Sequence, residues 1–189
     1  MTDNEIVVID GVLATSLDRT VVDVALGARN FAQALTAFDC ALARDADVEA
    51  IGQLLAERRR GVNLARRAFG FADGRSESPG ESWSRAQMID DGLPVPDLQV
   101  EYALRSGRTA RCDFGIDDVF VGEFDGLVKY RRNMRRGEEP EDVVIREKIR
   151  EDELRDLGLV VVRWVWEDLR RGRLMRILRS HYARLGIRV

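Results

Sequence analysis

The hydrophobic periodicity of the chain changes across a short turn-rich stretch, and this change limits the folds that the chain can adopt. Residues 72–80, Ala-Asp-Gly-Arg-Ser-Glu-Ser-Pro-Gly, are dense in residues that interrupt helices and strands. Apolar residues recur at helical spacing before this stretch, whereas short strand-like runs appear after it. We therefore expect a short hairpin plus helical segment over residues 1–72, a linker over 73–80, and a second domain over 81–189.

The N-terminal part is predicted to be a hairpin followed by helices. Asp10-Gly11 lies between two short apolar runs, which is the pattern of a two-residue hairpin turn. Thr15 is followed three positions later by Asp18, so we expect Thr15 to cap the first helix. Three more helices are expected over residues 31–43, 48–58 and 62–71.

The C-terminal part mixes helices and strands. In chain order we expect a helix over 79–91, strands over 98–104, 109–114 and 119–124, a helix over 143–157, a strand over 159–164 and a helix over 168–185. The order α-β-β-β-α-β-α indicates a mixed α/β domain. Because the last strand follows a helical crossover, we expect it to lie parallel to a neighbouring strand.

Composition narrows the class of protein. Among the 189 residues, 45% are hydrophobic and 33% are charged, which is typical of a globular protein. No apolar run approaches the ~18–20 residues of a membrane span, and the N-terminus lacks the pattern of a secretory signal. Cys40 and Cys112 have no second cysteine or histidine at metal-ligand spacing. We expect a cytoplasmic protein with no membrane association.

Charge is distributed unevenly along the chain. The net charge of the chain is -3, but residues 1–50 have a net charge of -6 and residues 163–189 have a net charge of +6. Of the 30 basic residues, only Lys129 and Lys148 are lysines. Arginine suits bidentate contacts with phosphate. The sequence therefore disfavours a general charge-driven coat on nucleic acid but allows a local basic face that meets phosphates.

Three acidic residues form the clearest candidate site. Glu123 and Asp125 lie two positions apart on a predicted strand, so their side chains point to one face. If the loop after Asp113 has an odd number of residues, Asp113 lies opposite Glu123 on that face, whereas an even number puts it on the other face. Two such carboxylates would share a cation, and oxygen-only ligands select Mg²⁺ (or Mn²⁺).

Several short motifs together resemble a known family. The resemblance rests on residues 78–81 (SPGE), 111–114 (RCDF), 121–126 (VGEFDG), 146–148 (REK) and 161–169 (VVRWVWEDL). Over about residues 76–185 the chain is similar to the PD-(D/E)XK nuclease superfamily, and within it to very-short-patch-repair-endonuclease-like domains. The resemblance implies a restriction-endonuclease-like α-β-β-β-α-β core behind a small N-terminal helical section. It also implies a Mg²⁺-dependent endonuclease that hydrolyses phosphodiester bonds in DNA, in repair or defence.

The resemblance assigns roles to residues of this chain. The metal ligands would be Glu81, Asp113 and Glu123, and the catalytic set would be Asp113, Glu123, Asp125 and Lys129. The phosphate contacts would be Arg131, Arg132, Arg135 and Arg136. The chain departs from the family pattern because Asp125 stands where the lysine of the acid-x-Lys pair is usual, so the ammonium would have to come from Lys129.

Two alternatives accompany these assignments. Ser78-Pro79-Gly80-Glu81 is also a capping box with proline at the first helical position, which explains Glu81 without a metal. Residues 7–45 resemble the helical segment of proteins associated with AbiEi-type antitoxins of type IV toxin–antitoxin systems. This resemblance and the missing lysine support an alternative function. In this alternative the chain is a catalytically inactive nuclease-fold protein that binds DNA or a protein partner.

Overall fold

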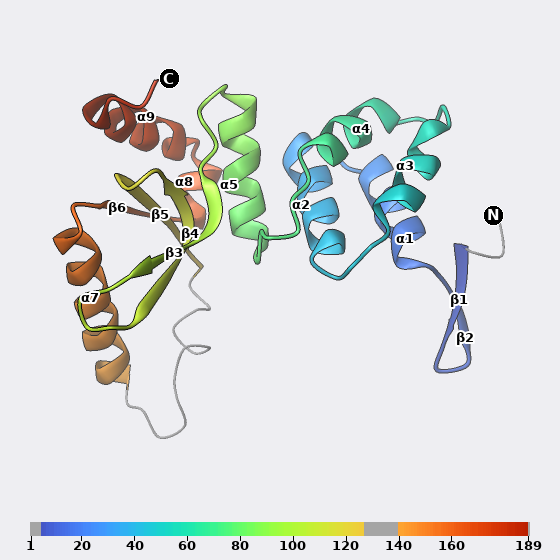
Figure 1. Cartoon of the computed structure of the whole chain (residues 1–189). Helices are drawn as coiled ribbons and strands as arrows, with labels where there is room; N and C mark the ends of the chain where they lie inside the picture. Colours follow the sequence, from blue (N-terminus) through green and yellow to red (C-terminus); the bar gives the residue numbers. More distant parts are fainter. Residues whose placement is uncertain (1–4, 127–139, 189) are drawn as a thin grey trace. The chain divides into compact units, whose positions relative to one another are not determined.

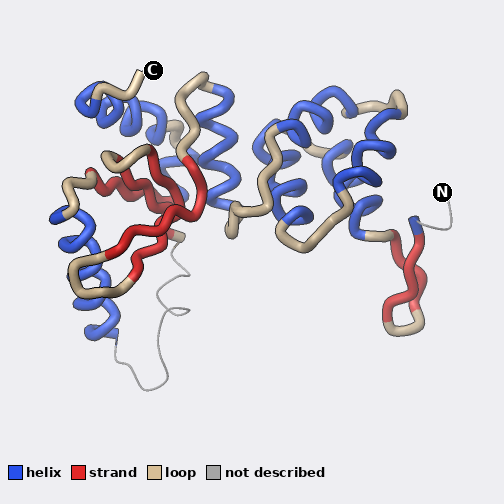
Figure 2. The backbone as a smooth tube through the Cα atoms, in the orientation of Figure 1, coloured by secondary structure: helices blue, strands red, loops and turns tan. Residues whose placement is uncertain are grey.

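The computed structural model describes residues 5–126 and 140–188 (Figure 1). The chain divides into two compact units, Met1–Ala86 and Gln87–Val189. Within the described ranges there are eight helices and two sheets, so the predicted mixed α/β class is confirmed (Figure 2). None of the helices in these ranges is long and apolar enough to cross a membrane.

The N-terminal unit starts with the predicted hairpin. Strands β1 (Ile6–Ile9) and β2 (Val12–Thr15) pair antiparallel, with Ile9 opposite Val12. The two turn residues both have left-handed backbone, with φ of 52° at Asp10 and 79° at Gly11. That conformation at both turn positions favours Asp-Gly, so the local sequence accounts for the turn.

Four helices follow, α1 (Leu17–Leu26), α2 (Phe31–Leu42), α3 (Val48–Ala56) and α4 (Val62–Gly70). The prediction that Thr15 caps α1 is wrong. Thr15 is paired with Ile6 at the end of the hairpin, and Ser16 is the cap, because its Oγ accepts the N–H of Arg19 at 3.3 Å. The core of this unit lies between the helices and is formed by fully buried residues such as Leu35, Phe38 and Ile51.

The two units divide inside helix α5 (Pro79–Asp90), beyond the linker expected at 73–80. The first turns of α5 are tied to the N-terminal helices by Arg85. Its Nη1 lies 2.7 Å from Asp39 Oδ2, with side chains only 7% and 0% exposed, and its Nη2 donates to the Phe71 carbonyl. A buried ion pair of this kind joins the start of α5 to α2, which the turn-rich composition of 72–80 does not reveal.

The C-terminal unit is built on a four-stranded sheet. Its strands β3 (Asp97–Ala103), β4 (Thr109–Ile116), β5 (Phe120–Asp125) and β6 (Val160–Val165) lie in that spatial order. The first three are antiparallel, and β6 pairs parallel with β5, as the helical crossover predicted. The helices are α7 (Pro140–Asp156), α8 (Trp166–Arg170) and α9 (Arg173–Leu185). The single helix expected over 168–185 is therefore two, separated at Gly172, whose φ is 61°.

The sheet is covered on both faces. On one face Leu154 of α7 packs in a buried cluster that includes Cys112, Val121 and Val161. On the other face the Phe120 ring meets Tyr182 of α9 edge-on, with centroids 5.2 Å apart. Figure 1 shows α7 and α9 on opposite sides of the sheet. The candidate site lies on the α7 side.

Candidate functional site

The β4–β5 hairpin carries the two central carboxylates. Its pairs run from Phe114–Gly122 to Ile116–Phe120, so three residues, 117–119, connect the strands. The sequence predicted that Asp113 lies opposite Glu123 if the number of connecting residues is odd, and three is an odd number. The ladder ends at the Phe114–Gly122 pair, and Asp113 and Glu123 are the next residue of each strand beyond it.

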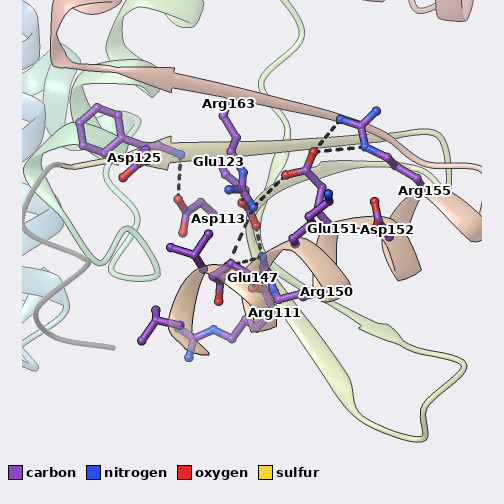
Figure 3. Close-up of a pocket in the computed structure, with 14 residues that line it drawn as sticks. Arg111, Asp113, Glu123, Asp125, Glu147, Arg150, Glu151, Asp152, Arg155 and Arg163 are labelled. Atoms are coloured by element: carbon purple, nitrogen blue, oxygen red, sulfur yellow. Dashed lines mark hydrogen bonds and ion pairs between the residues drawn. The ribbon is translucent and has the colours of Figure 1, made fainter. Parts of the chain in front are cut away.

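The carboxylates line a cavity of about 660 Å³. Asp113, Glu123 and Asp125 all contribute to its wall, together with side chains of α7 (Figure 3). Among the described residues the wall carries six acidic and five basic side chains, so their charges nearly balance. The basic ones are Arg111, Lys148, Arg150, Arg155 and Arg163. The cavity therefore lacks the strong negative charge that attracts a divalent cation.

Both oxygens of the Glu123 carboxylate are paired with arginine. Oε1 lies 2.5 Å from Arg150 Nη2 and Oε2 lies 2.9 Å from Arg163 Nε, with the Glu123 side chain 13% exposed. Arg163 is the residue paired with Glu123 in the β5–β6 ladder, so the strand register sets this contact. Arg150 reaches the same carboxylate from α7.

Arg150 is fixed by further contacts. Its Nη2 donates to the carbonyl of Arg111 at 2.9 Å and lies 3.6 Å from the Cys112 sulfur. Burial lowers the pKa of Arg150, but the hydrogen bond and charge of Glu123 raise it more, so its pKa lies above the ordinary value. Burial also disfavours the negatively charged thiolate of Cys112, and this raises the pKa of the Cys112 thiol to about 12. Arg150 is therefore a permanent cation here, and Cys112 is unsuited to act as a nucleophile.

The arginine contacts extend along α7. Arg163 Nη2 also lies 3.3 Å from Glu151, which in turn pairs with Arg155 at 2.7 Å. Arg150 Nη1 lies 3.4 Å from Glu147. Figure 3 shows these side chains converging from β6 and α7. Six side chains of the cavity wall thus form a connected set of ion pairs in which acids and arginines alternate.

Asp113 and Glu81 are held by hydrogen bonds of their own. Asp113 Oδ2 accepts the backbone N–H of Phe124 at 2.9 Å, which ties β4 to β5 through a side chain. Glu81 Oε2 accepts the N–H of Glu77 at 3.0 Å and Oε1 accepts the Ser78 hydroxyl at 2.6 Å. Glu81 is 1% exposed and belongs to the N-terminal unit. Its contacts are those of the capping alternative.

These residues do not fit the predicted metal site. Each carboxylate oxygen of Glu81 already accepts a hydrogen bond, and each oxygen of Glu123 already contacts an arginine, so a divalent ion would have to share all four. Within residues 5–126 and 140–188, no group of three or more His, Cys, Asp or Glu is arranged to hold a metal ion. Five predicted site residues lie outside the described residues: Lys129, Arg131, Arg132, Arg135 and Arg136.

Sequence reasoning missed Arg150 and Arg163. Arg163 carried a signal, because it is the one charged residue in the apolar run 159–164 and a charge in a buried strand requires a partner. Arg150 carried none, since it lies in a helix with charges throughout. Its role depends on which face of α7 packs on the sheet.

Comparison with known proteins gives relatives without an assigned activity. Two proteins of Mycobacterium tuberculosis, "Uncharacterized protein Rv2248" of strain H37Rv and "Uncharacterized protein MT2308" of strain CDC 1551 / Oshkosh, are each 36% identical over 182 residues. The similarity covers 93% of this chain, and this chain spans 64% of the length of these relatives. No family model and no solved structure matches the chain significantly.

Proposed function

We propose that the C-terminal unit has a restriction-endonuclease-like core of the PD-(D/E)XK type and that it binds DNA in the cytoplasm without cutting it. The observation that carries this proposal is the pairing of both Glu123 oxygens with Arg150 and Arg163. In a metal-dependent nuclease this carboxylate would be a ligand. Here it is neutralised by side chains of the protein itself.

The positive charge around Glu123 disfavours a metal ion there. Two guanidinium groups bring two positive charges to Glu123, which is the charge that one Mg²⁺ ion would bring. A cation at Glu123 would have to lie beside both guanidinium groups, and their positive charges would repel it. The arginines thus supply the stabilisation that a metal gives such a carboxylate, but they activate no water molecule.

DNA is the proposed partner for two reasons. The described elements from α5 to β6 follow the order α-β-β-β-α-β that the resemblance implies for a nuclease core. The basic residues are nearly all arginine, which is suited to phosphate contacts. The resemblance of residues 7–45 to antitoxin-associated proteins points to a regulatory role, in which a protein partner would also bind.

A second function is favoured by a specific observation. Asp113 and Glu123 line one cavity, as expected of a Mg²⁺-dependent DNA endonuclease. This candidate requires a cation to bind Glu123 beside Arg150 and Arg163, and it requires a lysine such as Lys129, which lies outside the described residues.

One experiment separates the two functions. Wild-type protein, Asp113→Ala and the control Asp118→Ala, a change in the turn of the same hairpin, are incubated with supercoiled and linear DNA in Mg²⁺, Mn²⁺ or EDTA. Binding is followed in parallel by fluorescence anisotropy in EDTA. We expect binding of duplex DNA by all three proteins and no cleavage in any buffer.

Two results would contradict the proposal. Cleavage by wild type and Asp118→Ala that is lost in EDTA and in Asp113→Ala would establish the endonuclease instead. Failure of the wild-type protein to bind any duplex would remove DNA as the partner and turn attention to a protein partner.

A further inference from the structure

The last 21 residues, 169–189, contain no acidic residue and seven arginines. We propose that the exposed face of α8 and α9 is a binding surface for the phosphate backbone of duplex DNA, separate from the cavity. This inference rests on the proposed function and adds the location of the DNA contact. The arginines are Arg170, Arg171, Arg173, Arg176, Arg179, Arg184 and Arg188.

The helix geometry separates the arginines from the core. Leu174, Leu178 and Tyr182 are fully buried on one face of α9. At 3.6 residues per turn, Arg173, Arg176 and Arg184 fall within an arc of about 80° on the opposite side. Arg176 and Arg184 are both exposed and lie about 12 Å apart along the helix axis, given a rise of 1.5 Å per residue. The face is therefore both basic and open to solvent.

Local acids neutralise only part of this surface. Arg171 pairs with Glu167, Arg173 with Asp168 and Arg179 with Asp91. The remaining arginines, Arg170, Arg176, Arg184 and Arg188, form no ion pair with an acid among residues 5–126 and 140–188. Arg170 instead has its guanidinium carbon 5.9 Å from the centre of the Trp166 ring. Such cations repel one another and are stabilised by a polyanion.

The chemistry of the face favours DNA over a lipid surface. A helix that binds at a membrane inserts apolar side chains between the lipids. The apolar side of α9 is already used by the sheet, where Tyr182 packs on Phe120. What remains exposed is mostly arginine, whose fork of N–H donors fits phosphate oxygens. A phosphate backbone can be bound in this way without any apolar insertion.

The surface begins at the edge of the sheet where the cavity lies. Asp125, which lines the cavity, is paired with Val165 at the end of β6, and α8 starts at the next residue. Trp166 at the start of α8 packs edge-on against Phe124, with ring centroids 5.1 Å apart. A duplex that lies along α8 and α9 would therefore extend toward the cavity edge.

The test compares two double variants of the whole chain. Arg176→Gln/Arg184→Gln removes two charges from the proposed surface, and the control Arg58→Gln/Arg60→Gln removes two exposed arginines from the N-terminal unit. Binding of a fluorescent duplex is measured from 50 to 200 mM salt in EDTA. The logarithm of the binding constant falls linearly with the logarithm of the salt concentration, and each phosphate contact makes this slope steeper by about 0.9. We therefore expect Arg176→Gln/Arg184→Gln to make the slope shallower by about 2 and the control to leave it unchanged.

The outcomes distinguish this inference from the proposed function. If wild type binds DNA and both variants show the same salt dependence as wild type, the proposed α8–α9 surface is wrong but DNA binding stands. Absence of wild-type binding would overturn both. Binding to phosphatidylserine vesicles is measured in parallel. If Arg176→Gln/Arg184→Gln loses vesicle binding but keeps the DNA affinity of wild type, the face binds lipid and the proposed DNA surface is wrong. Circular dichroism of each variant verifies that it is folded.

Discussion

The close contact between Gly122 and Trp164 allows a quantitative prediction for the strand that carries Glu123. A Cβ added at Gly122 would lie 2.6 Å from Trp164 Cη2 and 2.8 Å from Cζ3, well inside van der Waals contact. Trp164 is 1% exposed, and its ring packs against Phe114 with centroids 5.3 Å apart, so it has little room to move. Gly122→Ala therefore overpacks the sheet face that α9 covers.

The expected cost follows from overpacking of a core. Such substitutions lower the free energy of unfolding by about 1–3 kcal/mol. For a unit of about 100 residues, each kcal/mol lowers the melting temperature by about 4–8 °C. We expect the thermal transition of the C-terminal unit, followed by near-ultraviolet circular dichroism of its tryptophans, to fall by about 5–20 °C. Calorimetry assigns the transition if the two units unfold separately.

Two control variants test the stated cause. Gly52→Ala lies within α3 and its added Cβ meets nothing within 4 Å, so it should stabilise by about 0.5–1 kcal/mol. Trp164→Phe removes the outer ring atoms that clash, so Gly122→Ala should cost at least 1 kcal/mol less in that background. A Gly122→Ala variant as stable as wild type, or strict additivity with Trp164→Phe, would show that contact with Trp164 does not cause the loss of stability.

Three further predictions concern single residues. At pH 8 a thiol reagent should label Cys40 in the native protein but Cys112 only after unfolding, because burial raises the Cys112 pKa to about 12 and leaves about one molecule in ten thousand as thiolate; equal labelling rates by mass spectrometry would contradict this. Ser78→Ala should lower the free energy of unfolding in urea by about 1 kcal/mol through loss of the cap on α5, and an unchanged value would rule out that role. Arg85→Met should cost about 3–5 kcal/mol by leaving the buried Asp39 unpaired. Burial raises the pKa of Asp39, and loss of the Arg85 charge raises it further, so the folded variant binds a proton more tightly than the unfolded chain. The difference in the free energy of urea unfolding between wild type and Arg85→Met should thus shrink as pH falls toward 4. A difference that grows as pH falls would contradict this prediction.

Local patterns in the sequence were sufficient for much of the fold. The Asp10-Gly11 turn, the order of elements in the C-terminal unit and the cap of Ser78 on α5 all depend on interactions over a few residues, and the structure contains each of them. The sequence also predicted that Asp113 and Glu123 lie on one face if the turn has an odd number of residues; the turn has three, and both residues line one cavity. These features follow from backbone geometry and short-range hydrogen bonds.

Tertiary structure decided the chemistry of the candidate site and the division of the chain. Arg150 meets Glu123 across 27 positions of sequence, and Arg85 meets Asp39 across 46. Both contacts depend on which face of a helix packs on its neighbour. A charged helix such as α7 has several faces of similar composition, so its sequence pattern alone does not select one. Packing against the sheet selects the face, and that choice places a guanidinium on the carboxylate that the sequence had assigned to a metal ion.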